Sequence, residues 1–172
     1  KAETNANKFF NEIEKSGIII PGKTEKEINT EILKLARQKF NIKKFWHKRI
    51  VRIGKNTLLH YGHNPPDLVL QEDDIIFFDQ GPVFNNWEAD RGKTYVLGND
   101  EKKLKLKNDI EQAWIEGREF FTKNRKHLTG ADFYNYTKNL AKQYGWEYDT
   151  PHCGHLIGEF HHEQVLGDGV NN

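Results

Sequence analysis

Two aspartates, Asp79 and Asp90, have the spacing that most clearly indicates chemistry in this 172-residue chain. Runs that read as strands flank them, and Asn85 and Asn86 between them signal a turn, because asparagine tolerates a positive φ. A hairpin centred on this turn pairs Asp79 with Gly92 and sets Asp79 diagonal to Asp90 on one face. Carboxylates that close repel each other, and a divalent cation between them removes the repulsion. The alternative interpretation is two exposed turn acids without a role.

Histidines are concentrated near the end of the chain, where four of the eight lie between His152 and His162. Gly154 and Gly158 flank His155 closely, and glycine permits a close approach of backbone. A lone histidine is more often a packed or surface residue, but neutral imidazoles together with carboxylates are a ligand set for Zn, Mn, Fe or Co. Two aspartates and one histidine are too few for a two-metal site, so we expect further ligands.

The elements that must position these side chains are a mixture of helices and strands. Helices are predicted at residues 4–16, from Thr24 to Phe40, at 100–122 and from Thr129 to Gly145, and strands at 49–53, 75–84, 93–97 and 146–148. Residues 56–66 are predicted as the end of a strand that runs into a loop. In the third helix we expect Ile110 and Trp114 to face inward. Without strict alternation of strand and helix, the pattern indicates an α+β fold.

Composition excludes several classes of partner. The formal net charge is +1, so no overall field favours nucleic acid, and no apolar run approaches the ~20 residues of a membrane span. The single cysteine rules out an internal disulfide and favours a reducing compartment, which we take to be the cytoplasm. The length suits one domain, predicted to cover residues 1–172.

The chain resembles the pita-bread metallopeptidases, which include methionine aminopeptidases, Xaa-Pro aminopeptidases, prolidases and the creatinase group. The resemblance runs from about residue 20 to the end and rests on the joint order of four segments: Phe77-Phe78-Asp79-Gln80-Gly81, Asp90-Arg91-Gly92-Lys93-Thr94, Cys153-Gly154-His155-Leu156-Ile157-Gly158 and Phe160-His161-His162-Glu163. It implies an α+β fold with a mostly antiparallel, curved sheet covered by helices.

The resemblance also implies the residues of an active site. Divalent metal ions, two per site and drawn from Mn, Co, Zn or Fe, would be bound by Asp79, Asp90 and His155. Catalytic contacts to the substrate would come from two histidines, each with a neighbouring alternative: His60 (alternative His63) and His162 (alternative His161). Cys153 is interpreted as a residue that lines the pocket.

One departure from the family pattern concerns two glutamates. The family completes its site with two glutamates on strands after the histidine segment, and this chain stops at Asn172 before either is expected. Glu159 and Glu163 do not match them. We therefore expect the C-terminal strands to be missing, so that residues 1–172 form a single, incomplete catalytic domain of an intact enzyme.

The implied function is that of a metallo-exopeptidase, an aminopeptidase or dipeptidase that hydrolyses the N-terminal peptide bond. Leu58-Leu59-His60-Tyr61 and Asp79-Gln80-Gly81 favour the Xaa-Pro branch, whereas Cys153-Gly154-His155 favours methionine aminopeptidase; we favour Xaa-Pro. The implied partner is a peptide substrate, and the family allows a homodimer. The alternative, motivated by the missing glutamates, is a non-catalytic peptide- or protein-binding module with the same fold. A metal-free amidino hydrolase is disfavoured because the three residues expected to bind metal, Asp79, Asp90 and His155, are all present.

Overall fold

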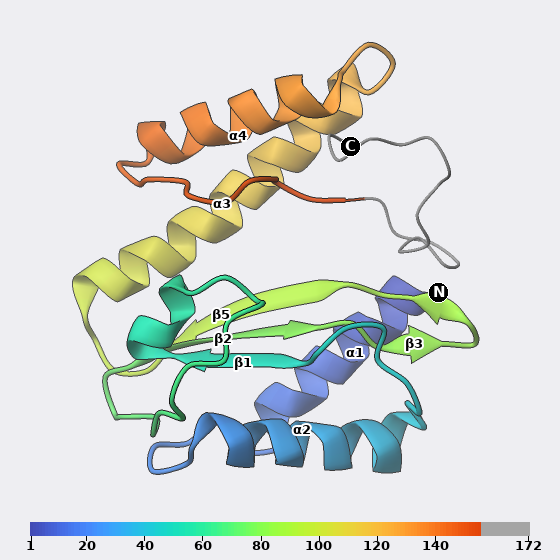
Figure 1. Ribbon diagram of the computed structural model, residues 1–172, viewed down its shortest axis with the longest axis vertical. Coiled ribbons are helices and arrows are strands. Elements are labelled where there is room, and N and C mark those ends of the chain that lie inside the picture. The colour runs from blue at the N-terminus through green and yellow to red at the C-terminus, as the bar shows by residue number, and fades with distance from the viewer. Residues whose placement is uncertain (156–172) are drawn as a thin grey trace. The chain divides into compact units, whose positions relative to one another are not determined.

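The computed structural model describes residues 1–155, which form two compact units, residues 1–100 and 101–155. Each unit is described by itself (Figure 1). The first unit combines helices with antiparallel strands, and the second consists of helices and irregular chain. The predicted α+β class is confirmed, while the single catalytic domain over 1–172 stays a prediction.

The first unit is built from two helices and a small sheet. Its elements are α1 (Ala2–Lys15), α2 (Glu25–Phe40), β1 (Ile50–Ile53), the 3₁₀ helix η1 (Gly54–Leu58), β2 (Ile75–Gln80), β3 (Val83–Phe84), β4 (Trp87–Glu88) and β5 (Arg91–Val96). The strands pair in the order β1-β2-β5, all antiparallel, and β3 pairs with β4. Two predictions were wrong in detail: the strand expected at 75–84 is interrupted after Gln80, and the expected strand end at 56–66 begins as η1.

Helices α1 and α2 cover one face of this sheet (Figure 1). Apolar side chains of both helices, spaced at about one helical turn, pack with alternate residues of β2, and Ile76 and Phe78 are fully buried among them. Each such side chain contributes about 1.5–3 kcal/mol when buried. Because side chains alternate along a strand, Asp79 points to the opposite face from Phe78. The face away from the helices is therefore the one that presents the carboxylate.

A buried carboxylate ties α2 to the sheet. Thr24 caps α2 through the predicted capping box with Glu27. The next residue, Glu25, is only 6% exposed, and its Oε1 accepts hydrogen bonds from the Ile53 amide at 2.7 Å and from the Asn56 side chain at 3.0 Å. Glu25 thus links the start of α2 to the end of β1.

The second unit contains α3 (Glu101–Asn124) and α4 (Gly130–Gln143), close to the predicted bounds. The helices pack through aromatic rings, and Phe120 stacks on Tyr136 with centroids 3.7 Å apart. The predicted inward face was wrong for Ile110 and Trp114, which are 47% and 62% exposed, and α4 is shorter than α3. The strand expected at 146–148 does not form, and those residues are irregular. Among the described residues, no helix has the length and apolar character that crossing a membrane requires.

Candidate metal centre

The turn of the hairpin forms where the sequence predicts it. Asn85 and Asn86 have φ values of 51° and 67°, a left-handed conformation that asparagine adopts more readily than most residues. They connect β3 to β4, where Phe84 pairs with Trp87. The predicted turn is therefore confirmed.

The register of the hairpin brings the two aspartates to one face. Asp79 pairs with Gly92, as predicted. The β3–β4 pairing continues the register of β2 with β5, which places Asp90 across from Gly81. Asp79 and Gly81 are two residues apart and share a face, so Asp79 and Asp90 are diagonal neighbours. Both carboxylates are on the face opposite the helices.

A third donor, His47, joins the carboxylates and was not predicted. Its Nε2 lies 3.4 Å from Asp79 Oδ1 and 3.9 Å from Asp90 Oδ1. One ligand atom from each of the three residues lies within 4.8 Å of the other two. Within the described part of the chain, no other group of three or more His, Cys, Asp or Glu side chains converges in this way. No spacing rule in the sequence connects His47 with the aspartates, because its position depends on tertiary pairing.

Backbone hydrogen bonds hold the His47 loop against the hairpin. The Val83 amide donates to the Lys44 carbonyl at 3.0 Å, and the Trp46 amide donates to the Gly81 carbonyl at 2.9 Å. The Trp46 indole N–H also donates to the Ala89 carbonyl at 3.0 Å. The loop before β1 therefore runs antiparallel alongside the hairpin at its interruption, where Phe45 pairs with Pro82.

Gly81 leaves room for the Trp46 and His47 side chains of this loop. A Cβ at this position would lie 2.4 Å from His47 Cδ2 and 2.4 Å from Trp46 Nε1. No side chain fits there unless the Trp46 and His47 rings move. The absence of a side chain at Gly81 thus allows the imidazole to approach the carboxylates.

The donor set fits a divalent cation. Two carboxylate oxygens and an imidazole nitrogen are ligands that Zn, Mn, Fe and Co accept. His47 Nε2 is buried and makes no hydrogen bond. A buried polar atom without a hydrogen bond is costly, and metal coordination would satisfy it.

The other histidines predicted for the site are not in this donor group. His60 is exposed; its Nδ1 accepts a hydrogen bond from the Gly62 amide at 3.4 Å, and its ring centroid is 6.4 Å from that of His63. His155 is exposed and belongs to the second unit, so its predicted approach to the carboxylates stays a prediction. His162 and its alternative His161 lie outside the described residues.

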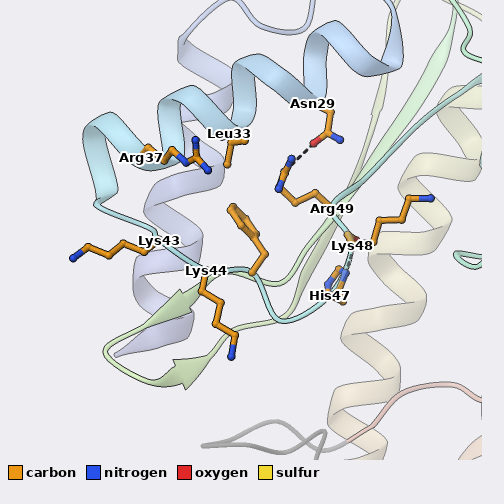
Figure 2. A pocket seen from close by; sticks show the side chains of 9 residues that line it. Asn29, Leu33, Arg37, Lys43, Lys44, His47, Lys48 and Arg49 are labelled. Carbon is orange, nitrogen blue, oxygen red and sulfur yellow. Dashed lines mark hydrogen bonds between the residues drawn. The ribbon is translucent and has the colours of Figure 1, made fainter.

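A basic pocket of about 400 Å³ adjoins His47 (Figure 2). Its lining is supplied by α2 and by the loop before β1: Asn29, Leu33, Arg37, Lys43, Lys44, Phe45, His47, Lys48 and Arg49. No acid lines it, and the described residues include no ion-pair partner for its lysines or arginines. Arg49 donates to Asn29 Oδ1 at 3.0 Å, and burial, then the charge of Arg37, lower the pKa of Arg49. The pocket therefore has the charge to hold an anionic group.

Comparisons with known proteins show the family of this chain. The model of metallopeptidase family M24 matches residues 1–172. An Xaa-Pro dipeptidase of Pyrococcus horikoshii is 24% identical over 147 residues, which are 84% of this chain and 40% of that protein.

Solved structures show the same fold. A dipeptidase from Pyrococcus horikoshii has a TM-score of 0.77 at 25% identity, with 95% of this chain and 44% of that chain covered. An Xaa-Pro dipeptidase from Bacillus anthracis has a TM-score of 0.76 at 24% identity, with 95% and 45% covered. This chain thus spans less than half the length of the relatives it matches. The predicted pita-bread fold is confirmed, and the chain belongs to metallopeptidase family M24.

Proposed function

We propose that the protein is a metal-dependent aminopeptidase or dipeptidase that hydrolyses the N-terminal peptide bond of peptides, with Xaa-Pro peptides favoured over Met-Xaa peptides. The observation that carries the proposal is the convergence of Asp79, Asp90 and His47 on one face of the hairpin. Family membership supports the reaction class. The similarity to an Xaa-Pro dipeptidase of Pyrococcus horikoshii supports the preference.

The proposal gives each predicted residue a role. Asp79, Asp90 and His155 hold divalent metal, two ions per site, drawn from Mn, Co, Zn or Fe. Metal bound there supplies a Lewis acid for the scissile carbonyl and lowers the pKa of water at the site. His60 and His162 donate hydrogen bonds where charge develops on the substrate.

The setting of the reaction is also part of the proposal. The substrate is a peptide, and neither nucleic acid nor a membrane is a partner, in line with the net charge of +1. The single cysteine supports a cytoplasmic location. A homodimer stays a prediction from the family resemblance.

The test is release of amino acids by the purified full-length protein supplied with Mn²⁺, Co²⁺, Zn²⁺ or Fe²⁺ in turn. We expect faster release from Xaa-Pro than from Met-Xaa peptides and loss of release with a chelator. Asp79→Asn and Asp90→Asn should abolish release, whereas Asp149→Asn, which removes an exposed carboxylate in the second unit, should not. Absence of release with every metal, or full activity of Asp90→Asn, contradicts the proposal.

A second candidate function is a non-catalytic module that binds peptides or proteins. The basic pocket favours it, because the cluster of lysine and arginine side chains that lines this cavity suits an acidic segment of a partner. Saturable binding of an acidic peptide, without hydrolysis in any metal, supports this candidate. Metal-dependent release of amino acids supports the enzyme.

A further inference from the structure

The hydrogen bonding of His47 determines which of its ring nitrogens carries the hydrogen. Nδ1 lies 2.6 Å from the Lys48 carbonyl oxygen. A carbonyl oxygen only accepts hydrogen bonds, so Nδ1 must be the donor. In the neutral ring, Nε2 is then left with a lone pair. That lone pair is on the side of the ring that approaches the two carboxylates.

The described surroundings of Nε2 supply no hydrogen bond to it. Nε2 is buried, makes no hydrogen bond, and lies 3.4 and 3.9 Å from the nearest oxygens of Asp79 and Asp90. A lone pair beside two carboxylates gains nothing from them, since all three groups are acceptors. Either a second proton on the ring or a cation among the three donors removes the conflict.

The distances favour a shared cation. Donors held at about 2.0–2.2 Å from one metal ion lie roughly 3–3.6 Å from each other. The separation of 3.4 Å from Asp79 falls in this range, and that of 3.9 Å from Asp90 needs a shift of only a few tenths of an ångström. A proton on Nε2 should instead point at one carboxylate oxygen, but the contact does not have the geometry of a hydrogen bond.

We propose that His47 is a direct ligand, through Nε2, of the divalent cation held by Asp79 and Asp90. The family resemblance does not assign this ligand, which adds to the set of Asp79, Asp90 and His155. Its Nδ1–H bond to the Lys48 carbonyl orients the ring, as carbonyl partners of metal-binding histidines commonly do. This inference rests on the proposed metal site but not on hydrolysis.

An imidazole ligand changes the choice of metal. Imidazole suits metals later in the first transition row, whereas a site of carboxylates alone suits Mn²⁺ as well. We therefore expect His47→Ala to weaken Co²⁺ binding about tenfold or more, and Mn²⁺ binding less. His127→Ala, which removes an exposed histidine of the second unit, should leave both affinities within twofold of the wild type.

The experiment measures dissociation constants for Co²⁺ and Mn²⁺ by calorimetry on the full-length protein, together with the proton NMR spectrum of its Co²⁺ form. We expect an exchangeable, paramagnetically shifted resonance from the Nδ1–H of His47, absent in His47→Ala and present in His127→Ala. Unchanged or tighter Co²⁺ binding by His47→Ala, with the resonance retained, overturns the inference, because the resonance then comes from another group. Failure of the wild type to bind either metal overturns the proposed metal site as well.

Discussion

The change Gly81→Ala tests whether the packing at Gly81 controls the metal centre. The added methyl group would lie 2.4 Å from both His47 Cδ2 and Trp46 Nε1, so the rings must move by about 1 Å to restore a normal contact. Neither ring moves without loss, because Trp46 donates to the Ala89 carbonyl and His47 to the Lys48 carbonyl.

The expected cost follows from these contacts. Forcing a methyl group into a filled site costs about 1–3 kcal/mol, and one broken hydrogen bond adds about 0.5–1.5 kcal/mol. We therefore expect Gly81→Ala to lower the free energy of unfolding by about 2–4 kcal/mol, measured by urea denaturation. Displacement of His47 should also weaken Co²⁺ binding, measured by calorimetry under native conditions.

Gly92→Ala is the matched control on the same hairpin. A Cβ at Gly92 meets only the Phe78 carbonyl oxygen, at 3.6 Å, which is an ordinary contact, and Gly92, like Gly81, does not have a positive φ. We expect a change below about 1 kcal/mol in stability and unchanged Co²⁺ affinity. If Gly81→Ala and Gly92→Ala change the free energy of unfolding and the Co²⁺ affinity equally, the close approach at Gly81 does not control the metal centre.

Three further predictions concern stability, pH and binding. Glu25→Ala should lower the free energy of unfolding in urea by about 3–5 kcal/mol, because two buried donors lose a carboxylate acceptor; Glu25→Gln, which keeps one acceptor oxygen, should cost less. Equal costs contradict this account. Hydrogen bonds from Thr129 lower the pKa of Asp132, so the stability they add is present above about pH 4 and is lost as the pH falls through the lowered pKa. Thermal melting should show Asp132→Asn less stable than the wild type at pH 7 and equal to it near pH 2; a constant difference argues against the linkage. Arg37→Gln should weaken the binding of an acidic peptide, measured by fluorescence anisotropy, and should reduce the salt dependence of that binding. Arg125→Gln, at an exposed position outside the pocket, should do neither. Equal effects of the two substitutions exclude the basic pocket as the binding site.

The carboxylate pair was predictable because its geometry is local. Two asparagines that tolerate positive φ set the turn, and the turn sets the register that pairs Asp79 with Gly92. The capping boxes that begin at Thr24 and Thr129 are local in the same sense, and both form. Such features depend on a few neighbouring residues, so pattern and propensity are enough to find them.

The remaining parts depend on contacts between distant segments. His47 reaches the carboxylates because the Trp46 amide and indole bond to the hairpin, and no periodicity reports such a pairing. Apolar spacing predicted a buried stripe on α3 but could not say how much of it α4 covers, and Trp114 is exposed. His60, named from the family resemblance, is exposed and outside the donor group.

The anchoring of Trp46 gives the protein a natural optical reporter. Its ring centroid is 4.1 Å from that of the adjacent His47, and its indole N–H bonds to the carbonyl of the residue before Asp90. A paramagnetic ion bound beside these rings would quench the fluorescence of Trp46, because energy transfer and electron transfer are both efficient over such a short distance. Trp87 and Trp114 are 52% and 62% exposed, so they emit at longer wavelengths. Trp146, the fourth tryptophan, is half-buried like Trp46, so its emission is removed by Trp146→Phe. Site occupancy can therefore be followed in an unlabelled Trp146→Phe variant by the loss of the blue-shifted emission of Trp46.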